Sequence, residues 1–109
     1  MRLPAPAALA ATLVLSFAAS GAAAQAPAND PARYLAANCA NCHGTAGRAV
    51  PGAGMPALAG LSRVYFIEQM TAFREGKRPA TIMHQLAKGY SDEQISLLAD
   101  YFSKQKPQP

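Results

Sequence analysis

The stretch CANCH, residues 39–43, contains both cysteines of this 109-residue chain and one of its two histidines. A structural zinc site needs four ligands, usually as two close pairs. The second pair here would be His43 and His84, and zinc is disfavoured because His43 is already adjacent to Cys42. A thioredoxin-like redox pair needs a βαβ context, and no stretch of the chain alternates with the period of a strand. A disulfide between Cys39 and Cys42 would close a very short loop and stabilise little, but it remains the plain alternative.

The histidine directly after the second cysteine favours another chemistry, since Cys-x-x-Cys-His is the attachment motif of c-type haem. In that motif each cysteine sulfur adds to one vinyl group, and the histidine binds the iron. We therefore predict one covalently bound haem c, held by Cys39 and Cys42, with His43 as an axial ligand. A haem also supplies an apolar surface around which a small chain can pack, and chains of this size often need such help.

The N-terminus has the features of a secretory signal peptide: a positive start, an uncharged apolar run, and Ala22 and Ala24 at the positions of an A-x-A cleavage site. We expect residues 1–24 to be removed, which leaves 85 of the 109 residues and therefore one domain. The apolar run is short for a membrane span, although an uncleaved anchor is the alternative. The mature protein is expected in the periplasm, where c-type haem is attached, with no membrane span.

The charge of the chain argues against one class of partner. The formal net charge is +4 and no basic run exceeds two residues, so nucleic acid is not an expected partner. A basic face that docks an acidic protein remains open.

The first half of the mature chain predicts one helix followed by a long loop. Residues 25–30 are small and polar and are expected to form a flexible lead-in to a domain at 31–106. Asp30 and Pro31 are typical of an N-cap and a first helical turn, which predicts a helix that continues through CANCH. Residues 44–60 contain five glycines and two prolines without periodicity, and therefore form a loop.

The second half predicts two amphipathic helices joined by a break. Residues 61–76 carry an apolar stripe at helical spacing. Residues 91–105 begin with a capping box, Ser91 and Gln94, and place their apolar side chains on one face. Between them, 77–89 contains a proline break and a short helical stretch. The fold class is therefore all-α with long loops.

The sixth position of a haem iron needs a second ligand, and the candidates are three methionines and the remaining histidine. Met70 belongs to a helical stripe, where methionine usually fills the core. Met55 follows His43 by only twelve residues and is expected to line the same side. Met83 or His84 follows a full helix that can carry the chain to the other face, and spacing does not separate these two.

Three stretches resemble class I c-type cytochromes, in particular small bacterial ones like the cytochrome subunit of flavocytochrome c sulfide dehydrogenase. They are YLAANCANCHGTAGR (34–48), MPALAGLSRVYFIEQMTAFREGKRPATIM (55–83) and AKGYSDEQISLLADYFSKQ (87–105). The resemblance implies a small class I cytochrome c fold, in which helices and long loops wrap around one covalently bound haem. It also implies that the N- and C-terminal helices cross.

The resemblance also assigns residues around the iron. It implies that Met83 is the distal axial ligand. It implies that the carbonyl of Pro56 accepts a hydrogen bond from Nδ1 of His43, which orients the ring and tunes its basicity.

Cationic side chains near the predicted haem have open roles. Arg48 is a candidate for neutralising a haem propionate, although an arginine next to glycine in a loop is usually only solvated. Arg74, Lys77 and Arg78 form either a solvated face or a docking patch beside the haem edge.

An iron with two protein ligands has no open site for a substrate, so we expect an electron carrier that transfers one electron at a time and is not catalytic alone. The resemblance implies the haem subunit of a periplasmic sulfide dehydrogenase, which accepts electrons from a sulfide-oxidising flavoprotein. The alternative is a stand-alone soluble periplasmic shuttle with no stable partner. A haem-based sensor or peroxidase-like enzyme would require a labile Met83.

Overall fold

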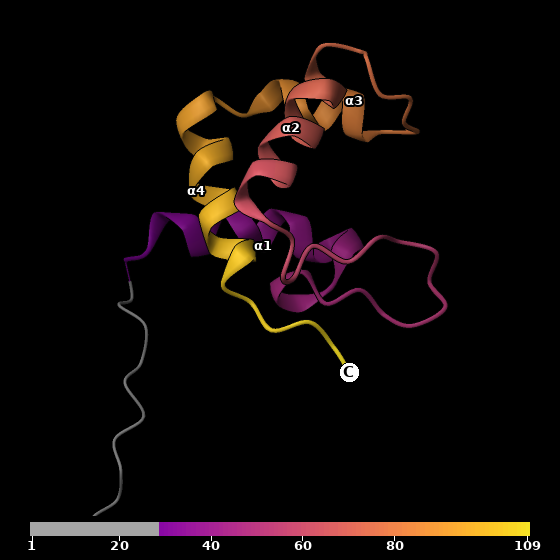
Figure 1. The fold of residues 1–109 in the computed structure, drawn as a ribbon, viewed down its shortest axis with the longest axis vertical. Coiled ribbons are helices and arrows are strands. Elements are labelled where there is room, and N and C mark those ends of the chain that lie inside the picture. The colour runs from indigo at the N-terminus through magenta and orange to yellow at the C-terminus, as the bar shows by residue number, and fades with distance from the viewer. Residues whose placement is uncertain (1–28) are drawn as a thin grey trace, which may run out of the picture.

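The computed structural model describes residues 29–109, so the predicted signal peptide at 1–24 lies outside it. The described part of the chain is helical and contains no strand, which confirms the predicted all-α class (Figure 1). Its elements, in order, are α1 (Pro31–His43), η1 (Thr45–Gly47), α2 (Arg63–Arg74), α3 (Met83–Leu86), η2 (Ala87–Gly89) and α4 (Asp92–Ser103). None of the helices in this part is long and apolar enough to cross a membrane.

Each long helix begins at a side chain that caps it. Asp30 accepts a hydrogen bond from the backbone N–H of Ala32 at 3.0 Å, with proline in the first turn. Ser62 caps α2, and Ser91 and Gln94 form the predicted capping box at the start of α4. These caps satisfy N–H groups that have no partner within the helix.

Helices α1 and α4 cross, and α2 packs on α4, so one small core forms where the three meet (Figure 1). Phe102 is at its centre, fully buried and stacked on Phe66 with ring centroids 5.5 Å apart. Leu35 and Tyr101 pack against the same core. Three of its eight buried members are alanine; the full set is Ala36, Phe66, Met70, Ala87, Ile95, Leu98, Ala99 and Phe102. So few large side chains make a thin core.

The loop after α1 is fastened at both ends of its path. The carbonyl of Gly47 accepts hydrogen bonds from the N–H groups of Leu58 and Ala59, at 2.8 and 3.1 Å. The N–H of Gly60 donates to the carbonyl of Phe102 at 2.9 Å. The predicted loop at 44–60 is therefore tied to its own start and to the end of α4.

Replacing Phe102 by alanine should lower the free energy of unfolding by about 3–5 kcal/mol, because it removes a fully buried ring from a core with few large members. Guanidinium denaturation followed by circular dichroism measures this. The control is Val64→Ala, at a side chain that is 65% exposed on α2, which should change stability by no more than about 0.5 kcal/mol. Equal losses in both variants would contradict the placement of the core.

Two loop glycines with similar backbone angles should respond differently to alanine. Gly47 and Gly52 have φ values of 74° and 79°, where any side chain costs about 1 kcal/mol. A Cβ on Gly52 would meet no atom within 4 Å, whereas on Gly47 it would lie 2.8 Å from Leu58 Cβ and from Phe102 Cδ1. Gly47→Ala should therefore lose roughly a further 1–3 kcal/mol of unfolding free energy. Thermal and denaturant unfolding of Gly47→Ala and Gly52→Ala measure this difference. Equal losses of unfolding free energy in the two variants would contradict the close contacts at Gly47.

Candidate functional site

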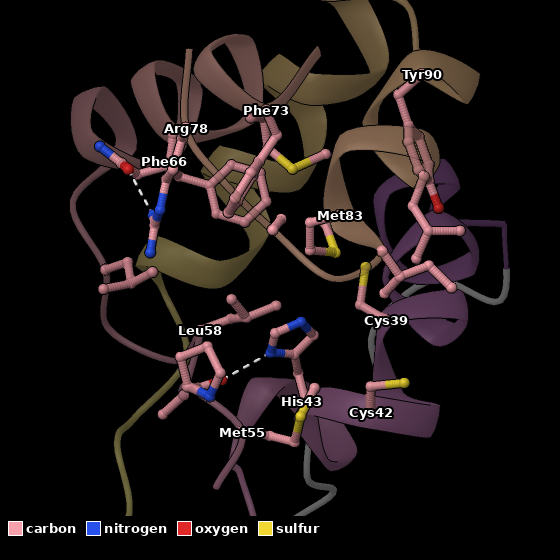
Figure 2. Close-up of a pocket in the computed structure, with 18 of the residues that line it drawn as sticks. Cys39, Cys42, His43, Met55, Leu58, Phe66, Phe73, Arg78, Met83 and Tyr90 are labelled. Atoms are coloured by element: carbon pink, nitrogen blue, oxygen red, sulfur yellow. Dashed lines mark hydrogen bonds between the residues drawn. The ribbon is translucent and has the colours of Figure 1, made fainter. Parts of the chain in front are cut away.

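A cavity of about 340 Å³ opens between α1, α2, α3 and the loop before α2 (Figure 2). Its walls are mainly apolar and aromatic. The lining residues include Cys39, Cys42, His43, Met55, Pro56, Leu58, Leu61, Tyr65, Phe66, Met70, Phe73, Ile82, Met83, Leu86 and Tyr90. An apolar cavity with a few convergent polar groups is the usual form of a cofactor site.

The CANCH motif occupies the last turn of α1. Positions i, i+3 and i+4 of a helix share one face, so Cys39, Cys42 and His43 all reach the cavity wall. No disulfide joins the two cysteines, of which Cys39 is half-buried and Cys42 is exposed. Burial raises the pKa of the Cys39 thiol. Burial and the nearby Cys39 also raise the pKa of the Tyr90 hydroxyl, against a hydrogen bond with Asn38 that lowers it.

His43 is only 7% exposed and is the one buried polar side chain in the described part of the chain. Its Nδ1 lies 2.7 Å from the carbonyl oxygen of Pro56. An imidazole that donates from Nδ1 keeps the lone pair on Nε2 for a metal. Figure 2 shows the ring standing at the cavity floor with Nδ1 turned to this carbonyl. This is the contact that the resemblance implied.

Met83 begins α3 and lines the cavity opposite His43 (Figure 2). His84, its neighbour, is not among the lining residues, and its Nδ1 is buried without a hydrogen-bond partner in the described structure. Met55 lies on the His43 side of the cavity in Figure 2. Met70 belongs to the buried core and also lines the cavity. Three of the four candidates thus line the cavity, and Figure 2 places Met83 opposite His43.

Arg74, Lys77 and Arg78, for which the sequence left open a solvated face or a docking patch, have different partners in the structure. Arg74 pairs with Asp92, and Lys77 with Glu75, both at 2.6 Å. Arg78 turns instead into the cavity, over the ring of Phe73. Arg48 donates from Nε to the carbonyl of Lys106 at 2.8 Å and does not line the cavity.

The residues present fit a c-type haem better than the alternatives. Both thiols, an imidazole with an oriented ring and a thioether converge on one apolar cavity. The described residues contain no group of three or more His, Cys, Asp or Glu side chains that could hold a metal ion directly. Sequence reasoning did not predict that Arg78 lines the cavity. The one sequence signal for it was its position shortly before Met83 in the chain.

Comparison with known proteins agrees with this site. The family model described as cytochrome c matches residues 28–106. The chain is 36% identical over 103 residues to the cytochrome subunit of sulfide dehydrogenase from Chlorobaculum tepidum, covering 86% of this chain and 92% of that protein. It is 44% identical over 72 residues to a thiosulfate dehydrogenase electron acceptor from Thiomonas intermedia, which is 66% of this chain and 33% of that protein.

Relatives of the cytochrome c4 type are longer. Cytochrome c4 from Pseudomonas aeruginosa is 34% identical over 95 residues, which is 87% of this chain and 47% of that protein. A solved structure of Acidithiobacillus ferrooxidans cytochrome c4 superimposes with a TM-score of 0.56 and 38% identity, over 60% of this chain and 37% of that one. The chain thus spans a third to a half of several relatives. With the match to the family model over most of its length, it belongs to the cytochrome c family, whose members carry covalently bound haem and transfer electrons.

Proposed function

We propose that this protein is a periplasmic electron carrier with one haem c, joined to Cys39 and Cys42 and ligated by His43 and Met83. The observation that carries the proposal is the convergence of both CANCH thiols, the His43 imidazole and the Met83 thioether on one apolar cavity. The chain contains one such motif, which supports a single haem. The bound haem supplies an iron that changes by one electron between the ferric and ferrous states.

The chain's own residues prepare the site for that exchange. The Pro56 carbonyl holds the His43 ring in one orientation and raises the basicity of Nε2. A thioether opposite the imidazole favours the reduced iron and so raises the reduction potential. The apolar wall formed by residues such as Phe66 and Leu58 excludes water and disfavours the extra positive charge of the ferric state. It therefore also raises the reduction potential.

The cellular location rests on the N-terminal sequence. Residues 1–24 have the charge, apolar run and small residues of a signal peptide. We propose cleavage after Ala24 and a mature domain at 31–106 that remains in the periplasm, preceded by a short lead-in at 25–30. The thiols of Cys39 and Cys42 would meet haem in that compartment.

The partner we propose is a sulfide-oxidising flavoprotein. This chain would be the haem subunit that accepts its electrons. The supporting observation is the similarity to a cytochrome subunit of sulfide dehydrogenase along 92% of that relative. Ile82 and Leu86 line the cavity mouth and are exposed, while Arg74 and Lys77 already have acidic partners. An apolar rim of this kind suits a lasting protein contact better than a basic rim does.

A stand-alone shuttle is the second candidate function. It is favoured by the similarity to a protein named as an electron acceptor of thiosulfate dehydrogenase, at 44% identity over 66% of this chain.

Replacing Met83 by alanine should abolish the methionine–iron charge-transfer absorption of the oxidised protein while leaving the haem attached through its thioethers. The open position should then bind carbon monoxide in the reduced state, which the wild-type protein should not do. Visible spectroscopy of the purified variant measures both. His84→Gln is the matched control at the neighbouring position and should keep the band. Survival of the band in Met83→Ala, or its loss in His84→Gln, would refute the assigned ligand.

The partner is tested by gentle recovery of the tagged protein from its own periplasm. Sharp haem c bands on dithionite reduction, with bleaching of flavin absorption, are expected for a flavocytochrome subunit. Gel filtration should show the two chromophores in one peak. Haem c bands alone, in a peak of monomer size, would support the shuttle instead. Absence of haem bands would contradict the assignment of Cys39 and Cys42.

A further inference from the structure

Arg78 is the one Asp, Glu, Lys or Arg side chain among the described residues that line the cavity. It is half-buried, and its guanidinium carbon lies 4.6 Å from the centroid of the Phe73 ring. Its Nη1 donates to the amide oxygen of Gln69, which also lines the cavity. Stacking and one hydrogen bond thus hold the cation against an apolar wall, while guanidinium offers five N–H donors in all.

The backbone also contributes to this position. At the end of α2 the N–H groups of Lys77 and Arg78 both donate to the carbonyl of Ala72, at 2.8 and 3.1 Å. The chain therefore reverses tightly after the helix. This turn sends the Arg78 side chain toward the cavity, while Lys77 reaches back to Glu75 at the surface.

Arg78 has no ion-pair partner among the described residues, in contrast to Arg74 and Lys77, which precede it in the chain. A cation withdrawn from water without a counterion is unfavourable, and such groups usually meet an anion. The described residues that line the cavity include no Asp or Glu, so the cavity wall offers Arg78 no anion and a negatively charged occupant of the cavity would supply one.

The two cysteines define which edge of a haem faces Arg78. Figure 2 shows Cys39 and Cys42 at one end of the cavity and Arg78 at the other. The vinyl groups of haem lie on two adjacent pyrroles, and the propionates lie on the other two. Attachment through the vinyls therefore turns the propionate edge away from the cysteines, toward the Arg78 wall.

We propose that the guanidinium of Arg78 binds a haem propionate. This inference rests on the proposed attachment of haem at Cys39 and Cys42. Arginine matches a carboxylate with two parallel N–H donors, and Phe73 and Gln69 keep it in place before the carboxylate arrives. The cation neutralises the propionate beside the iron, so it disfavours the ferric state and raises the reduction potential. Arg78 is a positioning residue for the cofactor.

The test uses the purified holoprotein and three variants: Arg78→Gln, Arg78→Lys and Lys77→Gln. The last is the matched control, because it removes the same charge one residue away from a side chain that is paired with Glu75 and does not line the cavity. Redox titration at one pH and ionic strength gives the midpoint potential. Redox-difference infrared spectra, recorded with haem labelled with ¹³C at its propionate carboxyls, report on the propionates themselves.

Arg78→Gln should lower the midpoint potential and displace the labelled carboxylate bands, and Lys77→Gln should change neither. Arg78→Lys keeps the charge without the paired donors, so it should lower the midpoint potential less than Arg78→Gln does but still displace the carboxylate bands. Arg78→Lys also tests the proposal if Arg78→Gln yields too little holoprotein to measure. Wild-type bands in both Arg78 variants, or an equal fall in potential in Lys77→Gln, would overturn the proposal. Absence of haem c bands from the wild-type protein would instead remove the proposed function on which it rests.

Discussion

The hydrogen bond from His43 Nδ1 to the Pro56 carbonyl joins the end of α1 to the loop that closes the cavity floor, and the rest of the site depends on it. It fixes the ring of the one buried polar side chain in the described structure. The loop that supplies this carbonyl is itself tied at Gly47 and at Phe102. A chain of backbone contacts therefore runs from the core at α4 to the imidazole.

The thin core explains why the chain surrounds a cavity. Three of eight core residues are alanine, and the largest buried rings, Phe66 and Phe102, stack on one another. Phe66 and Met70 belong to the core and also line the cavity, so one packing surface faces both ways. In a small domain the area buried on folding is marginal. A covalently held haem would extend this core with apolar surface that the side chains alone do not provide.

The cationic side chains around the turn after α2 lie in two different environments. Arg74 and Lys77 pair with carboxylates at the surface, where ion pairs contribute little to stability. Arg78 stacks on Phe73 inside the cavity. Lys77 and Arg78 follow one another in the turn whose N–H groups donate to the Ala72 carbonyl, yet Lys77 reaches Glu75 at the surface and Arg78 lines the cavity. This difference in environment supports the role that we propose for Arg78 toward a haem propionate.

The sequence by itself determined the helices and the cofactor chemistry, because both depend on neighbours in the chain. Caps at Asp30 and Ser91 and the spacing of CANCH act within one or two turns. The resemblance to class I cytochromes added Pro56 and Met83 to the expected site. Tertiary structure alone decided that Met83 lines the cavity while His84 does not, and that the Arg78 side chain enters the cavity while those of Arg74 and Lys77 pair at the surface. These outcomes depend on the direction in which a side chain leaves a turn packed against distant segments, and local spacing carries no information about that direction.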